Sequence, residues 1–178
     1  EKLDDNAEFP GADLILQGAE GAGKTTVLIA CAIKAFFSRG QKVLVLAADD
    51  LHRGYLHKRL LSAIKEIQFE NYCNCVELTD RAQALAWFSE SAPLADIIVT
   101  TLSDYEKSIW GASAPSANDI KRLRNFILKY EVVLVDDLLG FSDEERAHLP
   151  FTLAKIRAIL SAGNRPGQMV LTAPELES

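Results

Sequence analysis

The sequence predicts an α/β fold in which two layers of helices enclose a mostly parallel sheet. Continuous apolar runs recur along the chain, as in residues 42–48, and such runs are typical of strands that are buried on both faces of a parallel sheet. Segments with helical spacing of apolar residues, such as 51–67, separate these runs. A glycine-rich turn joins the first strand, residues 13–17, directly to a helix. Strands that alternate with helices in this way predict a three-layer α/β domain.

Length and composition fit one globular domain. The chain has 178 residues, of which 48% are hydrophobic and 25% are charged, and these values favour neither a disordered nor a membrane protein. The longest apolar stretch, residues 27–37, contains a lysine and is too short to span a bilayer. We expect residues 1–12 to be a lead-in segment and residues 13–178 to form the domain. Because the sequence has no start methionine and no signal peptide, we expect it to be part of a longer intracellular protein, either cytoplasmic or nuclear.

The glycine-rich turn has the spacing of a phosphate-binding loop. Gly18, four intervening residues and then Gly23-Lys24-Thr25 match the pattern G-x-x-x-x-G-K-[ST] between a strand and a helix. Glycines allow successive N–H groups to point at phosphate oxygens, and the following helix adds the positive end of its dipole. The sequence therefore predicts a site for ATP or another nucleoside triphosphate. The predicted binding residues are Gly18, Glu20, Gly21, Ala22, Gly23, Lys24, Thr25 and Thr26.

A second element supplies two adjacent carboxylates. Residues 131–137 form an apolar run that ends in Asp136 and Asp137. We expect Lys24 to neutralise the β- and γ-phosphates, and Thr25 and Asp136 to ligate Mg²⁺. Asp137 is then the predicted catalytic group that aligns the attacking water. The alternative is a capped strand-to-helix turn with no catalytic role.

The remaining elements are predicted from their periodicity and end signals. The first helix is expected over residues 25–38 and to end at Gly40, whereas Asp49 and Asp50 are expected to cap the helix 51–67. Further strands are predicted at 75–79, 96–101 and 168–172, and further helices at 81–89, at 118–129 and from Ser142 or Asp143 onward. Small and turn-forming residues predict a loop over residues 103–116.

Basic residues on the helix 51–67 leave two alternatives open. Its outer face carries Arg53, Lys58 and Arg59, which either form an ordinary solvated surface or contact a nucleic-acid backbone. Tyr105, in the predicted loop, is expected either to stack on a base or to pack against the domain. Since the net charge is −6, any nucleic-acid contact must be local.

The cysteines and histidines do not predict a structural metal site. Cys31 lies on the apolar face of the first predicted helix, where we expect a free buried thiol. Cys73 and Cys75 lack a second ligand pair at zinc-finger spacing, and the three histidines are scattered. The metal predicted by the sequence is therefore Mg²⁺ alone, together with the nucleotide.

Several segments resemble one family when they are taken together. They are residues 17–26 (QGAEGAGKTT), 40–47 (GQKVLVLA), 56–60 (LHKRL), 96–103 and 131–137. This set resembles the first RecA-like domain of superfamily 1 helicases, particularly the branch that contains the RNA-decay helicases. The resemblance implies a RecA-like P-loop motor domain that binds and hydrolyses ATP with Mg²⁺, contacts single-stranded DNA or RNA, and needs a second RecA-like domain with an arginine finger. The nucleic-acid contacts that it implies are Arg53, Lys58, Arg59, Thr101, Ser103 and Tyr105.

The chain departs from that family at its later motifs. Asp137 and Gly140 stand where the family has a glutamate and a glutamine, and residues 172–174 (TAP) replace a Gly-Asp pair. These departures predict slow hydrolysis and weak coupling to nucleic acid. One alternative is an AAA+ replication initiator or helicase loader, which residues 135–137 and 169–172 resemble, although the additional strand at 96–101 suits the helicase order better. Another is a degenerate module that binds a nucleotide or a protein partner without turnover.

Overall fold

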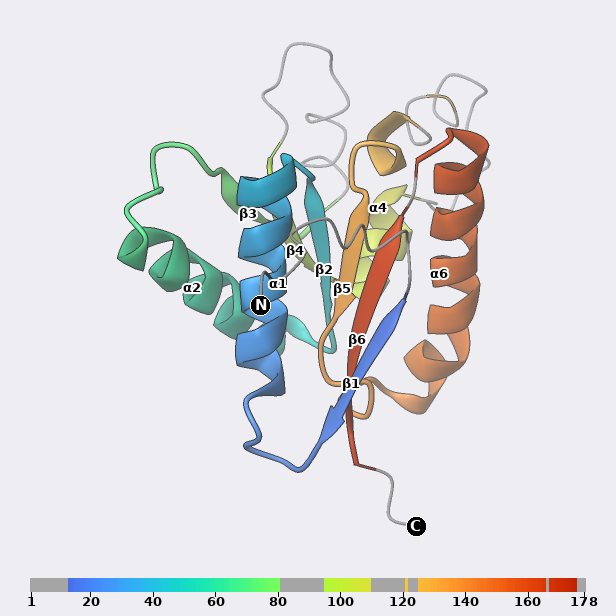
Figure 1. Ribbon diagram of the computed structural model, residues 1–178. Coiled ribbons are helices and arrows are strands. Elements are labelled where there is room, and N and C mark those ends of the chain that lie inside the picture. Colours follow the sequence, from blue (N-terminus) through green and yellow to red (C-terminus); the bar gives the residue numbers. More distant parts are fainter. Residues whose placement is uncertain (1–12, 81–94, 110–120, 122–124, 166, 176–178) are drawn as a thin grey trace, which may run out of the picture.

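Six parallel strands form one sheet in the order β1-β6-β5-β2-β4-β3 (Figure 1). The computed structural model describes residues 13–80, 95–109, 121, 125–165 and 167–175. In chain order the elements are β1 (Leu14–Gly18), α1 (Lys24–Arg39), β2 (Val43–Ala47), α2 (Asp50–Glu66), β3 (Cys75–Leu78), β4 (Ile97–Thr101), α4 (Leu102–Ile109), β5 (Val132–Val135), α6 (Asp143–Ala162) and β6 (Gln168–Pro174).

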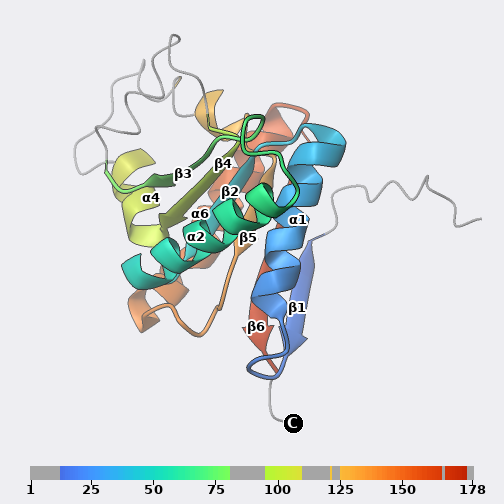
Figure 2. The same cartoon turned by 90° about the vertical axis from the view of Figure 1, so that its left-hand side faces the viewer.

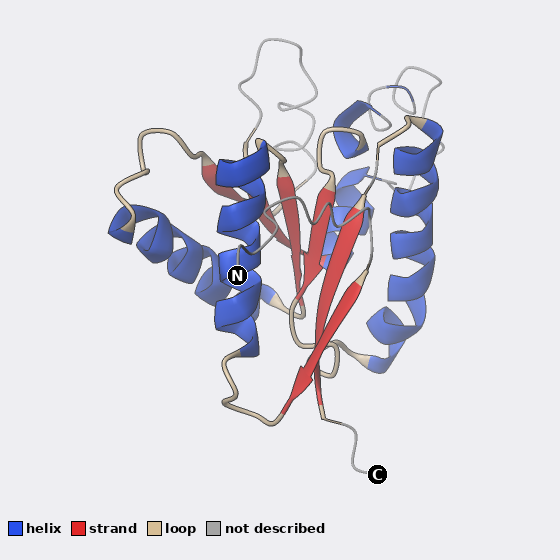
Figure 3. Cartoon of the chain, viewed as in Figure 1, coloured by secondary structure: helices blue, strands red, loops and turns tan. Residues whose placement is uncertain are grey.

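Helices cover both faces of this sheet. The helices α1 and α2 lie on one face and α4 and α6 lie on the other, so that the molecule has three layers (Figures 1 and 3). In β2, Val43 and Val45 pack towards α1 and α2, whereas Leu44 and Leu46 pack towards α4 and α6. This alternation follows from the two-residue period of a strand, and it explains why β2 is apolar throughout. The prediction of a three-layer α/β fold is confirmed.

The ends of the helices follow their capping residues. Gly40 ends α1 in the left-handed conformation, at a φ of 64° that suits glycine. Asp49 caps α2 by accepting a hydrogen bond from the backbone N–H of His52 at 2.7 Å. Ser142 and Glu145 form a reciprocal capping box at the start of α6. All three helix boundaries were predicted from the sequence.

The loop predicted over residues 103–116 is wrong in its first half, which is helical. Residues 102–109 form the helix α4 directly after β4. Thr101 Oγ1 accepts a hydrogen bond from the backbone N–H of Asp104 at 3.0 Å and so caps this helix. Two residues of the helix, Leu102 and Tyr105, are buried. The predicted helix 81–89 lies outside the described residues, as does most of the predicted helix 118–129.

The thiols are free in the described part of the chain. Burial raises the pKa of Cys73 to about 11 and that of Cys75 to about 12, so both remain protonated at neutral pH. Cys31 is only half-buried, which corrects the expectation of a buried thiol. Among the described residues, no group of three or more His, Cys, Asp or Glu side chains is arranged to hold a metal, and no helix is both long and apolar enough to cross a membrane.

Candidate functional site

The glycine-rich loop lies at the carboxyl edge of the sheet, between β1 and α1. Gly21 and Gly23 have φ angles of 77° and 84°, in the left-handed region that glycine adopts without strain. Gly23 is the N-cap of α1 and supplies no side-chain cap, so the first-turn N–H groups of the helix keep their capacity to bind an anion. The parallel sheet places the ends of β5 and β6 at the same edge.

Lys24 lies folded over the loop. Its Nζ donates to the carbonyl oxygens of Gly18 at 2.6 Å and of Ala19 at 2.8 Å. These bonds hold the ammonium group beside the loop that was predicted to receive phosphates. A phosphate oxygen is a stronger partner for an ammonium than a neutral carbonyl, so binding would exchange weaker bonds for stronger ones.

Asp136 joins the two predicted motifs. Its Oδ2 accepts a hydrogen bond from Thr25 Oγ1 at 2.8 Å, across 111 residues of chain, and its Oδ1 accepts one from Thr172 Oγ1 at 2.6 Å. His52 Nε2 lies 3.1 Å from the same Oδ2. The carboxylate is buried, with 1% of its surface exposed. Three side chains from α1, α2 and β6 therefore fix its orientation.

These contacts shift the pKa of both ionisable partners. The hydrogen bond to Asp136 raises the pKa of His52 above its ordinary value, although partial burial opposes the shift. Burial alone would raise the pKa of Asp136, but the hydrogen bonds from His52, Thr172 and Thr25 outweigh it and lower the pKa. At neutral pH Asp136 is therefore an ionised carboxylate.

Asp137 has an uncommon backbone conformation. Its φ is 55°, and its backbone N–H donates to Thr172 Oγ1 at 2.7 Å. A Cβ atom built on Gly140 would lie 2.8 Å from Asp137 Oδ2, so the carboxylate extends along the turn towards Gly140. Asp137 therefore presents its carboxylate at the surface of the same cleft as Asp136.

A single cleft of about 640 Å³ contains these groups. This volume is within the range of small-molecule sites. Every predicted nucleotide residue lines it except Gly18, which contributes its carbonyl to Lys24. Both predicted carboxylates line it too. The lining residues are Glu20, Gly21, Ala22, Gly23, Lys24, Thr25, Thr26, His52, Tyr55, Arg59, Asp136, Asp137, Leu139, Gly140, Thr172 and Pro174.

Four polar side chains of this cleft were not predicted as part of a nucleotide site. His52, Tyr55 and Arg59 come from α2, which begins soon after β2 ends at the same sheet edge. Thr172 comes from β6, opposite Asp136. The available signal was that α2 begins soon after β2 ends and that Thr172 lies towards the carboxyl end of its strand, because in a parallel sheet these positions gather at a single edge.

The residues predicted to contact nucleic acid are mostly engaged within the fold. Arg53 bonds Glu77, Asp104 and Asp50. Tyr105 has no exposed surface and therefore cannot stack on a base in this structure. Of the two alternatives for Tyr105, the structure has the one in which it packs against the domain.

The other predicted nucleic-acid residues are dispersed. Thr101 is 5% exposed and caps α4. Arg59 lies in the nucleotide cleft. Lys58 remains exposed and Ser103 is half-buried.

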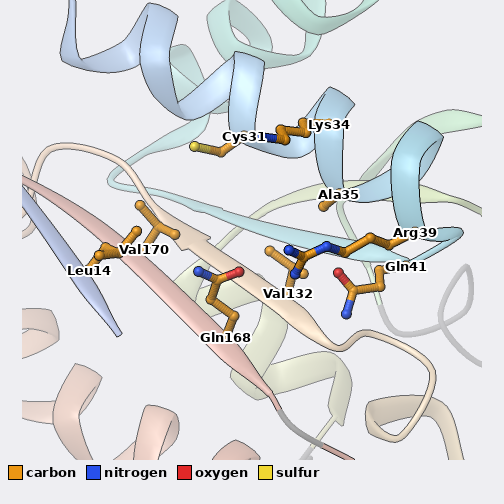
Figure 4. Close-up of a pocket in the computed structure, with 9 residues that line it drawn as sticks. All are labelled: Leu14, Cys31, Lys34, Ala35, Arg39, Gln41, Val132, Gln168 and Val170. Atoms are coloured by element: carbon orange, nitrogen blue, oxygen red, sulfur yellow. The ribbon is translucent and has the colours of Figure 1, made fainter. Parts of the chain in front are cut away.

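A second, smaller cleft of about 130 Å³ lies near the amino ends of the strands. Figure 4 shows it between the second half of α1 and the starts of β1, β5 and β6. Its lining is largely apolar, with Lys34 and Arg39 contributed by α1. It shares no residue with the larger cleft.

Comparison with known proteins identifies the fold but not a family. No family model matches the chain, and no curated protein matches its sequence. Among solved structures, the KaiC-like protein PH0186 from the archaeon Pyrococcus horikoshii OT3 aligns over 93% of this chain and 64% of its own, with 20% identity and a TM-score of 0.47. The ATPase domain of the large terminase of Thermus phage P74-26 aligns over 97% of this chain and 63% of its own, with 11% identity and a TM-score of 0.53.

The likeness to the terminase domain shows a RecA-like P-loop α/β fold, as the sequence predicted. This chain spans slightly less than two thirds of the length of both solved structures. At these identities the likeness does not distinguish a superfamily 1 helicase from other proteins with this fold.

Proposed function

We propose that this chain binds a nucleoside triphosphate, most simply ATP, together with Mg²⁺, as the first RecA-like motor domain of a superfamily 1-like helicase. The observation that carries the nucleotide assignment is the hydrogen bond between Thr25 and Asp136. Two motifs recognised separately in the sequence meet there, beside Lys24 and in a cleft of suitable size. The helicase assignment is supported by the sequence resemblance and is compatible with the fold.

The residues present fit a magnesium ion. Thr25 Oγ1 and Asp136 Oδ2 are oxygen donors that lie 2.8 Å apart, and Mg²⁺ binds through one or two such groups together with phosphate oxygens and water. Bound Mg²⁺ would neutralise charge on the β- and γ-phosphates. Lys24 would add a second positive charge there, and the N–H groups at the start of α1 would orient the phosphates.

For hydrolysis we assign the alignment of water to Asp137, whose carboxylate lies at the surface of the cleft. A second RecA-like domain would supply the arginine finger. Of the residues first predicted to contact single strands, Lys58 and Ser103 remain accessible from solvent and would make that contact.

The substitution Lys24→Ala tests the nucleotide assignment. We expect it to weaken MgATP binding by more than about tenfold, because hydrogen bonds to charged groups contribute about 1.5–3 kcal/mol. Isothermal titration calorimetry at fixed Mg²⁺ measures the affinity, and thermal unfolding without nucleotide verifies that the fold is retained.

The matched control is Lys34→Ala, which removes a lysine from the same helix at the second cleft. It should leave the affinity for MgATP unchanged. If instead Lys34→Ala weakens binding and Lys24→Ala does not, the nucleotide occupies the second cleft and the phosphate-loop assignment is incorrect.

A second candidate is a nucleotide-dependent interaction module without turnover. The engagement of Arg53, Thr101 and Tyr105 within the fold favours it, because they are then not available to a nucleic acid. ATPase rates with and without single-stranded DNA or RNA separate the two functions. Stimulation by single strands supports the motor domain, whereas MgATP binding without hydrolysis or stimulation supports the module.

A further inference from the structure

We propose that Arg59 is a phosphate ligand of the nucleotide site, which supplies a positive charge from α2 to the α- and β-phosphates. The inference rests on the proposed nucleotide function and adds a residue outside both sequence motifs. It also reassigns Arg59, which the resemblance had placed on a nucleic-acid surface.

The contacts of Arg59 place its guanidinium beside the phosphate loop. Its Nη2 donates to Thr26 Oγ1 at 3.1 Å, and Thr26 belongs to the first turn of α1. The loop and this first turn present the N–H groups that cradle the α- and β-phosphates in a P-loop. A guanidinium in hydrogen-bond contact with that turn is within reach of an anion bound there, and both Arg59 and Thr26 line the cleft.

A neighbour on the same helix holds Arg59 in this position. Arg59 Nη1 donates to the hydroxyl of Tyr55 at 2.9 Å, and the guanidinium carbon lies 5.7 Å from the centre of the Tyr55 ring. The two residues are one helical turn apart, so their side chains lie on one face of α2. The orientation of Arg59 is therefore set before any ligand binds, which lowers the entropic cost of contacting one.

The charge of Arg59 has no acidic partner among the described residues. Arg53, six residues earlier on α2, forms ion pairs with three carboxylates, whereas both hydrogen bonds of Arg59 are to neutral hydroxyl groups. Arg59 Nη1 and Nη2 each use one N–H group in these contacts and keep a second, so the half-buried guanidinium still has donors for a phosphate. If Arg59 formed an ordinary ion pair on the protein surface, a carboxylate would lie beside its guanidinium.

The charge balance of the cleft favours a second cation beside Lys24. Glu20, Asp136 and Asp137 line it and carry negative charge, and a nucleotide adds more. Lys24 and Arg59 are the permanently cationic side chains among its lining residues.

The test compares Arg59→Ala with Lys58→Ala in the full chain. We expect Arg59→Ala to weaken binding of both MgATP and MgADP by about 10- to 100-fold and Lys58→Ala to change either affinity by less than about twofold. Tyr55→Phe removes the hydroxyl that holds Arg59 and should produce a smaller loss. Arg59→Lys retains the charge without the planar fork and should recover part of the affinity.

The outcomes separate this inference from the proposed function. If the parent chain does not bind MgATP, the proposed function fails. If the parent binds it in a Lys24-dependent way and Arg59→Ala binds equally well, only the inference fails. A loss confined to MgATP would overturn the assignment to the α- and β-phosphates. Loss of single-strand binding with unchanged nucleotide affinity would return Arg59 to a nucleic-acid surface.

Two further measurements show whether each variant is folded. Circular dichroism and thermal unfolding compare each variant with the parent in the absence of nucleotide. If Arg59→Ala does not fold, Arg59→Lys and Arg59→Gln carry the test, with a greater loss of affinity expected for the glutamine variant because it has no charge.

Discussion

Asp136 is the side chain on which the cleft converges. Both carboxylate oxygens accept hydrogen bonds within the protein, and Oδ2 is close to both Thr25 and His52. A cation bound at Oδ2 would lie close to the Thr25 hydroxyl, which we assign to magnesium, and to the His52 imidazole, which would repel the cation when protonated. The ionic state of His52 is therefore set by the same carboxylate that we assign to the metal.

His52 provides a prediction about pH. Its raised folded-state pKa contributes stability that is fully present below its ordinary value of 6.5 and is lost as the pH rises through the raised pKa. We expect Asp136→Asn to return the pKa of His52 towards 6.5, because the hydrogen bond to Asp136 is the largest cause of the shift. NMR titration of the imidazole, without Mg²⁺ or nucleotide, measures it.

The matched control for this titration is Asp137→Asn. Asp137 contributes only a smaller charge interaction with His52, so its replacement should lower the pKa less. Equal shifts in the two variants would contradict the hydrogen bond between His52 and Asp136.

Asp136 itself has a lowered pKa, so its contribution to stability is present above pH 3.8 and is lost as the pH falls through the lowered pKa.

The backbone at Asp137 gives a physical reason for an aspartate at this position. Its φ of 55° lies in the left-handed region, where aspartate and asparagine are enriched and longer side chains are not. A glutamate there would reach further into the cleft at a conformational cost. The shorter carboxylate thus matches the tight turn from Asp137 to Gly140, in which the N–H of Gly140 bonds the carbonyl of Asp137 at 2.9 Å.

At the scale of elements, α2 connects two regions of the molecule. One face contributes His52, Tyr55 and Arg59 to the cleft. On its other side Arg53 bonds Glu77 at the end of β3 and Asp104 in the first turn of α4. Figure 2 shows α2 in front of the sheet beside α1, where it is placed to make both sets of contacts.

Arg53 therefore has a structural role that mutation can measure. Its side chain is 12% exposed and its partners on other elements are partly buried, so Arg53→Ala leaves charges without their partner. Burial alone would raise the pKa of Glu77, but the bond from Arg53 helps to lower it. We expect a loss of about 1–3 kcal/mol in the free energy of unfolding, measured with urea.

Lys58→Ala is the control for this measurement, because Lys58 is an exposed residue of the same helix. Its effect should stay within about 0.5 kcal/mol. Arg53→Lys should lie between the two, since lysine cannot bond several carboxylates with a planar fork. If Arg53→Ala is no more destabilising than Lys58→Ala, the three ion pairs contribute nothing to stability.

The contrast between Arg53 and Lys58 shows where sequence reasoning stops. The six strands, the ends of α1 and α2, the start of α6 and the phosphate loop are local patterns, and each was predicted to within two residues, whereas α4 was missed. Arg53 and Lys58 look alike by helical spacing, but Glu77 and Asp104 come from other elements and cannot be recognised from periodicity. The sequence predicted Tyr105 in a loop, because its burial depends on packing between α4 and the sheet, which periodicity does not reveal.

At the scale of the whole molecule, the sheet order assembles the site. β6 lies between β1 and β5, so Thr172 is flanked by the phosphate-loop strand and the strand before Asp136. Sequence reasoning predicted Thr25 and Asp136 as partners through the metal. It did not predict Thr172, because the pairing of the last strand between two earlier ones is a property of topology.

We expect the 178-residue chain alone to hydrolyse ATP slowly and not to unwind duplexes. The reason is that the proposed function assigns the arginine finger to a second RecA-like domain, and such a group contributes about 10³–10⁵ in rate. Single-turnover ATPase measurements and a strand-separation assay test this directly. Duplex unwinding by the chain alone would contradict the two-domain proposal.

The pairing of β1 has a consequence for how the protein is made. Within the described sheet, β1 hydrogen-bonds only to β6, the last strand to be synthesised. At about 5–20 residues per second, translation separates these strands by on the order of ten seconds. The inner strands β2, β4 and β5 can associate during that interval, whereas β1 still has no partner strand. The phosphate loop therefore takes its final shape last, and a bound nucleotide would stabilise the chain only after the ribosome has completed β6.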